Sequence, residues 1–479
     1  MSDPAAIREA IIRALPQDTS YSGEAPPPKY LYTPPAHLKA LSLESQLVVG
    51  TRGVGKSVWT ASLADAELRK QIGATIPQLE KAEIHIGFSE HPDLSSYPDP
   101  GTFSELLNKH GFDAYIVWRA IAARWLSRQL GESVPCNSWP ETVDWVRNNP
   151  EPLARMVQHA SGKFKNEGLH DLLIFDALDR LSNSWQVMDE IVRDLLRVAL
   201  WLKPYRHISA KIFLREDQLE RAINFPDASK LLATKAELTW ERHDLHGLLW
   251  QYLLNASDVH GECLRRVYTD TVGTEPRHTD SKWSLAEELK RETPSQRKLF
   301  KALAGPWMGR DRRRGVPYVW TVSHLADGQG RTSPRSFLAA IRQAAEDSRE
   351  RYQDHPYALH YESIKRGVQK ASEIRVNELA EDYPWIRPML RPLSGLTVPV
   401  AFADILEKWK QAFPQEPQQS ITNDVLPPEH VEQGWEGVRE DLLRLGVFEL
   451  RKDGRIDMPD LYRVGFRLGR RGGVKPKTR

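Results

Sequence analysis

Residues 46–57 read QLVVGTRGVGKS. The apolar run 46–49 has the composition of a short buried strand, and the GTRGVGKS that follows fits GxxxxGK[ST] at every fixed position. A helical spacing of apolar residues then extends from Val58 to about Lys70. A strand, a glycine-rich turn and a helix in this order predict a phosphate-binding loop at the carboxyl end of a β-strand. A chance glycine-rich turn is the alternative, and the matching context argues against it.

Each residue type in this loop has a physical role. Glycines let backbone N–H groups curl around phosphates without Cβ clashes, and the helix N-terminus adds partial positive charge. We expect Lys56 to reach the β- and γ-phosphates and the Ser57 hydroxyl to bind Mg²⁺. The predicted nucleotide-binding residues of the loop are Gly50, Thr51, Arg52, Gly53, Val54, Gly55, Lys56, Ser57 and Val58.

A second strand-like run, LLIF at 172–175, ends in Asp176. Such a strand delivers the carboxylate to the sheet edge where ligands bind, so Asp176 is predicted to act at the Mg²⁺ site; capping the next helix is the alternative. Many ATPases place a catalytic Glu next, but position 177 is Ala. Asp179 is then the nearest candidate base, unless it pairs with Arg180; Glu190 and Glu216 are more remote.

Arginines mark two further candidate positions. Arg215 ends a strand-like run, where a guanidinium is expected to contact the γ-phosphate, unless it pairs with Glu216 or Asp217. Arg335 opens a later helix and would contact phosphate from a second domain, unless it is only a solvated side chain in a helix N-terminal turn. The loop GRDRRRG at 309–315 is interpreted as solvated, with nucleic-acid binding or insertion into a neighbouring subunit's site as alternatives.

The order of elements predicts an α/β fold. Five strand-like runs, at about 46–49, 82–88, 171–179, 207–217 and 235–240, alternate with helical patterns and indicate a five-stranded parallel sheet in a P-loop NTPase core. Helical patterns after residue 255, and a helix followed by a hairpin around Asp453-Gly454, predict a helical lid and a C-terminal winged-helix-like module. The expected segments are an N-terminal helix and Pro-rich arm (1–44), the core (45–255) with a helical insertion (about 95–165), the lid (256–350), a helical linker region (351–426) and the module with a basic tail (427–479).

Composition narrows the class of protein. The chain has 479 residues, a net charge of +2 and two cysteines, which excludes a strongly basic nucleic-acid binder, a disulfide framework and a cysteine zinc site. The first residues lack the apolar core of a signal peptide, and no apolar run is long enough for a membrane helix. We therefore expect a cytoplasmic protein without a membrane partner. His243 and His246 lack further ligands, so no metal other than Mg²⁺ is expected.

The ordered set GTRGVGKS, LLIFDALDR and a strand ending in Arg215 resembles the STAND and AAA+-like P-loop ATPases. The small residue at 177 followed by Asp179 resembles the NACHT branch, and Asp179-Arg180-Leu181 resembles KAP-type ATPases, which usually carry a second Asp at the place of Ala177. The resemblance implies ATP and Mg²⁺ as ligands, with Lys56 and Ser57 as the residues that bind the nucleotide and the metal ion. It also implies Asp176 at the metal, Arg215 as first sensor and Arg335 as second sensor. Many such bacterial proteins belong to antiphage defence systems.

Two functions from different classes follow. The first is a switch or assembly ATPase, with slow hydrolysis, that couples nucleotide state to a protein partner or to a homo-oligomer. The second is a DNA-engaging ATPase that uses its C-terminal module and a basic tail, whose cations are Arg467, Arg470, Arg471, Lys475, Lys477 and Arg479. A small-molecule kinase is less well supported, because no acceptor-binding constellation is visible. A GTPase would need [NT]KxD, and residues 234–237 read TKAE, so ATP is preferred.

Overall fold

The computed structural model describes residues 3–17, 24–182, 184–279, 282–421 and 427–476. These form two compact units: a sheet unit of residues 24–239, and a helical unit in which residues 3–17 join residues 240–476. The five segments predicted from the sequence are finer than this division, and their boundaries stay predictions.

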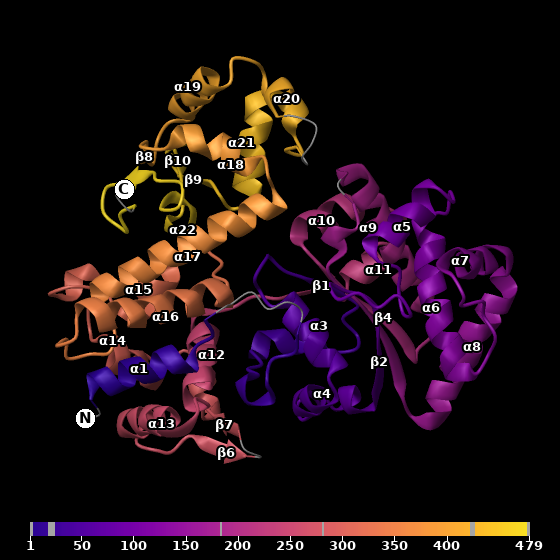
Figure 1. Ribbon diagram of the computed structural model, residues 1–479, viewed down its shortest axis with the longest axis horizontal. Helices are drawn as coiled ribbons and strands as arrows, with labels where there is room; N and C mark the ends of the chain where they lie inside the picture. Colours follow the sequence, from indigo (N-terminus) through magenta and orange to yellow (C-terminus); the bar gives the residue numbers. More distant parts are fainter. Residues whose placement is uncertain (1–2, 18–23, 183, 280–281, 422–426, 477–479) are drawn as a thin grey trace. The chain divides into compact units, whose positions relative to one another are not determined.

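The sheet unit is built on the predicted five-stranded sheet (Figure 1). Its strands are β1 (Leu47–Val49), β2 (Ala82–Phe88), β3 (His170–Phe175), β4 (Ile208–Leu214) and β5 (Ala236–Glu237). They pair in the order β2-β3-β4-β1-β5, and every pairing is parallel. The α/β class and the parallel sheet are therefore confirmed. All five strands end at one edge, where open α/β sheets bind ligands.

The helix after the glycine-rich turn is shorter than its sequence pattern indicated. Instead of one helix to about residue 70, there are two, α3 (Lys56–Ala64) and α4 (Ala66–Gly73). The break falls at Asp65, which is extended and accepts a hydrogen bond from the Leu68 N–H at 2.8 Å. An N-cap of this kind stabilises a new helix start, and it overrides the continuous apolar spacing.

Between β2 and β3 the chain forms the predicted helical insertion: α5 (Pro100–Asn108), α6 (Ala114–Leu130), α7 (Trp139–Asn148) and α8 (Pro150–Glu167). Trp118 of α6 is fully buried and donates through Nε1 to Ile191 O at 3.0 Å, in helix α9 (Trp185–Leu202). Its ring also packs edge-on against Phe88 and Phe175, the last residues of β2 and β3. The insertion thus covers the sheet beside the ends of these strands. Helices α10 (Glu216–Ala222) and α11 (Ser229–Leu232) complete the unit.

The Pro-rich arm is held to the core by buried polar contacts. His37 accepts from Trp59 Nε1 at 3.1 Å through Nδ1 and contacts Thr239 O through Nε2 at 2.9 Å. Lys211, in the middle of β4, is fully buried and donates to the carbonyls of Ala40, Ser42 and Ser45. One buried ammonium group thus binds the carbonyl of Ala40, in the last turn of helix α2 (Leu38–Leu41), and two carbonyls of the segment that follows this helix.

The helical unit begins with α1 (Pro4–Ala14), which packs on α13 (Asp258–Val272) and α16 (Pro334–Arg351). Arg8 of α1 is buried and donates to the carbonyls of Tyr352, Tyr357 and Ala358. The remaining helices before residue 350 are α12 (Arg242–Leu254), α14 (Pro294–Ala304) and α15 (Pro317–His324). We expected only helices and loops in the lid (256–350). That was wrong, because β6 (Arg277–Thr279) and β7 (Lys282–Ser284) form a short antiparallel ribbon.

The C-terminal part has the order of a winged helix. After α17 (Tyr361–Asp382) and α18 (Ile386–Leu390), Val400 forms an antiparallel bridge to Ile456. Helices α19 (Phe402–Ala412), α20 (Pro417–Ser420) and α21 (Gly434–Arg444) follow, then the hairpin of β9 (Glu449–Leu450) and β10 (Ile456–Asp457). Helix α22 (Asp460–Arg463) precedes β11 (Gly469–Arg470), which pairs with β8 (Thr397–Val398). The helices, the bridge and the hairpin confirm the winged-helix-like prediction.

One cation of the predicted basic tail is held within this fold, whereas Arg467, Arg471 and Lys475 are exposed. Arg470 donates to Asp457 Oδ1 at 2.5 Å and to Asp460 Oδ1 at 3.3 Å, and Val474 is buried. Lys477 and Arg479 lie outside the described residues. Among the helices that the structure describes, none combines the length and the apolar composition that crossing a bilayer requires.

The His37 contacts predict a pH dependence of stability. Burial lowers the pKa of His37 to about 4, against the opposing hydrogen bond to Thr239. Between about pH 4 and the ordinary value of 6.5 the unfolded chain binds more protons, so the free energy of unfolding should fall as the pH drops through this window. The contribution of His37 is at most about 3 kcal/mol.

Urea unfolding of the full chain at pH 7.0, 5.5 and 4.5 measures this effect. His37→Phe should be less stable at pH 7, because Trp59 Nε1 loses its acceptor, and should show a shallower loss on acidification than the wild type. Equal losses in both proteins would contradict the assignment.

Candidate active site

The turn after β1 has the geometry of a phosphate-binding loop. Gly53 and Gly55 have φ angles of 77° and 107°, which side chains with a Cβ rarely adopt, and α3 begins directly after Gly55. Gly50 donates to Leu214 O at 3.1 Å, and a Cβ on Gly50 would lie 2.7 Å from Val54 Cγ1. The glycines are therefore required by the backbone path itself, with the first turn of α3 directed at the loop.

Lys56 lies across this turn. Its ammonium group donates to Gly50 O and to Thr51 O, each at 2.9 Å. These bonds hold a positive charge over the loop, beside the N-terminus of α3, where the helix dipole also favours an anion. The loop therefore combines backbone N–H groups, a helix terminus and one cation, the set that binds phosphate in such loops.

Asp176 lies next to the loop. It follows the last residue of β3, is 3% exposed, and its N–H donates to Phe88 O of β2 at 2.9 Å. Burial raises the pKa of Asp176, while the hydrogen bond from Ser57 and the charge of Lys56 lower it in part. A serine hydroxyl hydrogen-bonded to a buried carboxylate is a pair of oxygen donors suited to Mg²⁺. Ser57 and Asp176 therefore fit the predicted metal site.

Two ion pairs cross the strand ends on either side of Asp176. The Arg215 guanidinium contacts Asp179 Oδ2, and the Arg180 guanidinium contacts Glu90 Oε1. Asp179 and Arg180 are consecutive residues of the 3₁₀ turn Leu178–Arg180 after β3. The order Glu90, Arg180, Asp179, Arg215 thus follows the ends of the adjacent strands β2, β3 and β4, and we call these four side chains the charge ladder.

The charge ladder adds a pairing that the sequence analysis did not consider. There Asp179 was a candidate base, with pairing to Arg180 as the alternative, and Arg215 a candidate γ-phosphate contact, with pairing to Glu216 or Asp217 as the alternative. In the structure Asp179 and Arg215 pair with each other, and Asp217 pairs with Arg221. Burial raises the pKa of Asp179, but Arg215 and Lys56 outweigh this effect and hold it below its ordinary value. Asp179 is therefore a carboxylate engaged by a cation, and its role as a base stays a prediction.

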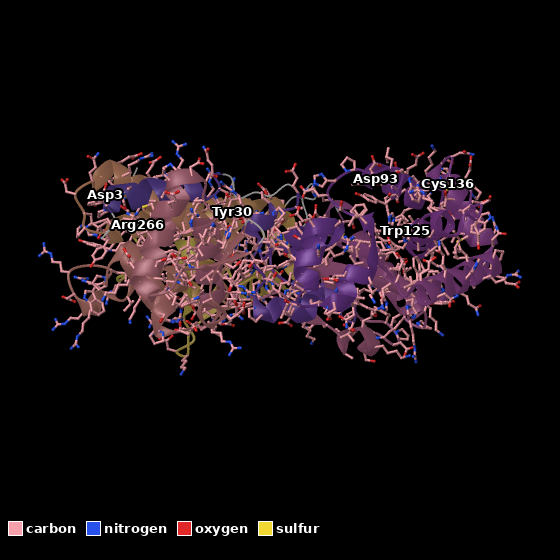
Figure 2. The ribbon with its side chains drawn as sticks, turned by 90° about the horizontal axis from the view of Figure 1, so that it is seen from below. Asp3, Tyr30, Asp93, Trp125, Cys136 and Arg266 are labelled. Carbon is pink, nitrogen blue, oxygen red and sulfur yellow. The ribbon has the colours of Figure 1, made fainter. Side chains whose placement is uncertain are left out.

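A cavity of about 440 Å³ opens beside the metal-site residues. Helix α3 contributes Ser57, Thr60, Ala61 and Ala64 to its lining, and the segment after β2 contributes Asp93 among others; Asp93 is labelled in Figure 2. Asp176, Ala25, Asp65, Ile86, Ser89, Glu90, His91 and Tyr97 complete the lining. The cavity therefore connects the metal-site oxygens to side chains after β2 that the sequence analysis did not select.

Glu90 is the main residue that the sequence analysis missed. The available signal was its position two residues after the predicted strand 82–88, since parallel neighbours end at the same edge. Nothing in the sequence indicated that this strand pairs directly with β3, because about 80 residues separate the two.

Arg335, the predicted second sensor, is in the helical unit. It lies in the first turn of α16, behind the N-cap Ser333, and its Nη1 donates to Glu378 Oε1 of α17 at 2.5 Å. A contact with phosphate would compete with this ion pair. Its sensor role stays a prediction.

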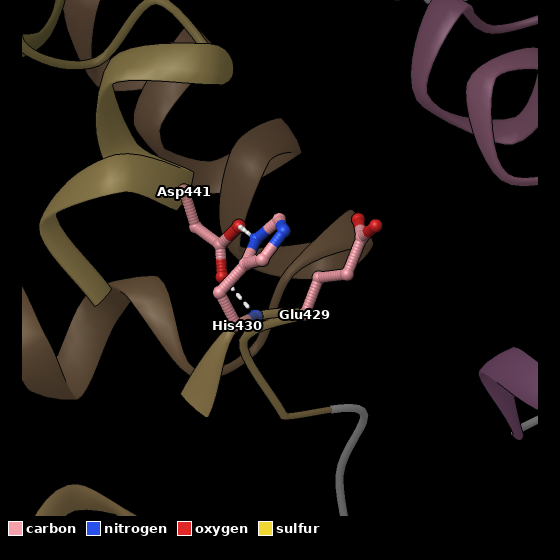
Figure 3. Close-up of side chains that lie close together, drawn as sticks. All are labelled: Glu429, His430 and Asp441. Carbon is pink, nitrogen blue, oxygen red and sulfur yellow. Dashed lines mark hydrogen bonds and ion pairs between the residues drawn. The ribbon is translucent and has the colours of Figure 1, made fainter. Parts of the chain in front are cut away.

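A second cluster of metal-ligating residue types lies in the C-terminal part, formed by Glu429, His430 and Asp441 (Figure 3). Asp441 accepts from the His430 N–H at 2.9 Å and contacts Nδ1 at 2.7 Å. Arg444 forms ion pairs with both Glu429 and Asp441. A guanidinium therefore occupies the carboxylates that a metal ion would need, and the cluster is better explained as the contact that fixes residues 429–430 on α21.

No protein-family model matches the chain, and no curated protein matches it either. Among solved structures, the chain is similar to Cdc6p from Pyrobaculum aerophilum, with 12% identity and a TM-score of 0.31, covering 87% of this chain and 83% of that one. It is also similar to the Aeropyrum pernix ORC1 protein in complex with DNA (13%, TM-score 0.35, 89% and 90%). The Aeropyrum pernix ORC2 protein in ADPNP–ADP complexes is a third (12%, TM-score 0.30, 88% and 86%). Likeness at this level assigns no role to any residue.

The charge ladder predicts that replacing Arg215 and replacing Asp179, the two partners of one ion pair, have unequal effects on ATP turnover. Arg215→Ala removes a guanidinium expected at the γ-phosphate and should lower ATP turnover at least tenfold. Asp179→Asn breaks the same pair but leaves Arg215 in place, so turnover should stay within about threefold of the wild type.

Turnover of radiolabelled ATP by the two variants measures this difference. Normal turnover in Arg215→Ala would contradict a phosphate-contacting role for Arg215, and an equal loss in both variants would favour Asp179 as the base.

Proposed function

We propose that the protein is a slow Mg²⁺-dependent ATPase that acts as a switch, coupling its nucleotide state to a partner protein. The observation that carries the proposal is the grouping of Lys56, Ser57 and Asp176 at the carboxyl edge of the parallel sheet, beside a glycine turn and a helix N-terminus. A phosphate site of this construction suits a nucleoside triphosphate, and the sequence lacks the guanine-selecting motif.

The residues would divide the work in a definite way. The loop N–H groups and Lys56 bind and orient the β- and γ-phosphates, and Ser57 and Asp176 hold the Mg²⁺ ion, which neutralises phosphate charge when bound. Arg215 contacts the γ-phosphate after leaving Asp179. Catalysis of this kind is mostly positioning and charge stabilisation. Loss of one of these groups should therefore lower the hydrolysis rate while leaving the folded structure largely unchanged.

Slow turnover follows from the residues around Asp176. Ala177 stands where many ATPases carry a catalytic glutamate, and Arg215 and Arg335 both begin in ion pairs that compete with phosphate. An ATPase in which these ion pairs must rearrange before each turnover is suited to a switch that signals its nucleotide state, and less suited to rapid ATP hydrolysis. The resemblance to STAND and AAA+-like ATPases supports a protein partner or a homo-oligomer that responds to the nucleotide state. It also supports a role in an antiphage defence system.

The switch is tested by hydrogen exchange of the full chain with ATP, with ADP and without nucleotide. ATP should protect residues 50–57 and, through the opening of the Arg335 pair, change exchange at the start of α16. Lys56→Ala should abolish both effects. Protection confined to residues 50–57 would support nucleotide binding but contradict a switch that involves Arg335.

A DNA-engaging ATPase is the second candidate, supported by one surface of the helical unit. Arg310, Arg312, Arg313 and Arg314 are exposed, and among the residues that the structure describes no ion pair neutralises them. Trp307, close in sequence, is 36% exposed. Exposed guanidinium groups beside an aromatic side chain suit phosphates and unstacked bases.

The winged-helix-like module is less suited to DNA than the sequence suggested. Its helix α21 exposes Glu436 and Glu440, which would repel phosphates at the position where such modules place a recognition helix. In the hairpin, Arg451 pairs with Asp457 and Arg455 with Asp453. The support for DNA contact therefore comes from the arginine loop at 309–315 and from the exposed tail cations Arg467, Arg471 and Lys475.

Two triple variants separate these surfaces. Replacing Arg312, Arg313 and Arg314 by Ala should weaken DNA binding and reduce the slope of log affinity against log salt by about 3 for duplex, or about 2 for single strands. Replacing Arg451, Lys452 and Arg455 removes the same charge and should change affinity little. Fluorescence anisotropy from low to moderate salt measures both, and a larger effect of the second variant would overturn the assignment to the loop.

A further inference from the structure

We propose that Glu90 is the general base that activates the attacking water, in place of the glutamate that is missing after Asp176. This inference rests on the proposed ATPase function and adds a catalytic residue to it. It is carried by the cavity beside the metal-site residues and by the charge ladder.

The first step is position. β2 pairs directly with β3, and the strands end together at Phe88 and Phe175. Glu90 follows β2 by two residues, as Asp176 directly follows β3, and both line the same cavity with Ser57. The loop that carries Glu90 is fixed, because the Tyr97 hydroxyl contacts Ser89 Oγ at 2.9 Å and donates to His91 O. Glu90 therefore begins from an ordered backbone beside the predicted metal site.

The second step is that the other carboxylates lining the cavity are already engaged in hydrogen bonds. Asp65 accepts from the Leu68 N–H as the N-cap of α4, and Asp93 accepts from Ser95 N and Ser95 Oγ. Asp176 is hydrogen-bonded by Ser57. Glu90 differs from these three, since its carboxylate contacts an exposed arginine side chain, a pair worth little and easily opened. It is the cavity carboxylate that moves at least cost.

The third step is a place for water. The cavity has a volume of about 440 Å³ and is lined by Glu90 as well as by Ser57 and Asp176. Water fills polar cavities of this size. The cavity thus offers room for a water molecule in a space that the Glu90 carboxylate shares with the oxygens that would hold the metal of bound ATP.

The chemistry balances with the groups named. The water oxygen forms a bond to the γ-phosphorus as its proton passes to the Glu90 carboxylate. The bond from the γ-phosphorus to the bridging oxygen breaks, and ADP leaves with that electron pair. Glu90 then returns the proton to phosphate or solvent. A base placed in this way contributes about 10²- to 10⁴-fold to the rate.

Arg180 gives the proposal a matched control. Glu90→Gln and Arg180→Gln both remove the same ion pair, but only the first removes the carboxylate. If Glu90 served the fold alone, the two substitutions would have similar effects. If it is the base, only Glu90→Gln abolishes turnover.

The experiment is single-turnover hydrolysis with enzyme in excess over labelled ATP. Three further measurements are made on each variant. ATP affinity is measured by titration, the nucleotide bound in the complex is extracted and identified, and stability is measured by urea unfolding. Glu90→Gln should lower the rate about a hundredfold, keep ATP affinity within about threefold and retain unhydrolysed ATP. Arg180→Gln should stay within about threefold of the wild-type rate, and Glu90→Asp should recover part of the loss.

An equal loss in Glu90→Gln and Arg180→Gln, or normal turnover in Glu90→Gln, would overturn the proposal. If the wild type binds ATP without hydrolysing it, the role of Glu90 as a base would be overturned, but the nucleotide site would not. Wild type that binds no ATP would overturn the proposed function together with this inference.

Discussion

Parallel pairing of β1 with β4, β4 with β3 and β3 with β2 is the constraint on which the site depends, because only this order brings four separated segments to one sheet edge. The phosphate-binding loop, Arg215, Asp176 and Glu90 each lie directly after one of these strands or within two residues of its end. Hydrophobic burial of the strands stabilises the pairing, and the insertion adds to it through Trp118, whose ring packs on the last residues of β2 and β3. The chemistry of the edge is thus positioned by the core beneath it.

Each charged group at this edge has a partner within the sheet unit, which phosphate would have to replace under the proposed function. Lys56 is bound by two loop carbonyls, Arg215 by Asp179, and Glu90 by Arg180. The pair of Glu90 with Arg180 is partly exposed and opens at modest cost, whereas Arg215 is largely buried and would leave Asp179 only for a stronger partner such as a triphosphate. Because Asp179 and Arg180 are neighbours on one short turn, movement of Arg215 toward phosphate would reach Glu90 through two residues. A slow switch is consistent with this arrangement, since several contacts must change before the reacting groups are free.

The sequence predicted what local patterns encode. The glycine turn with Lys56 and Ser57 was found because its spacing is fixed by backbone geometry, and the strand before Asp176 because four apolar residues end in a carboxylate. Pairings between distant segments were not predictable. Arg215 with Asp179, Arg180 with Glu90, and the docking of α1 through Arg8 all depend on tertiary contacts that carry no sequence spacing. Short ribbons such as β6–β7 were missed because three residues give no periodicity, and the end of α3 was missed because Asp65 caps a new helix within an unbroken apolar pattern.

The most direct test of the central claim is calorimetric titration of the full chain with ATP, with and without Mg²⁺, for the wild type, Lys56→Ala and Asp176→Asn. The account predicts binding by the wild type that Mg²⁺ strengthens, loss of binding in Lys56→Ala, and binding in Asp176→Asn that no longer responds to Mg²⁺. Binding that is unchanged in Lys56→Ala, or a Mg²⁺ response that survives in Asp176→Asn, would contradict the assignment of the nucleotide and metal site to the carboxyl edge of this sheet.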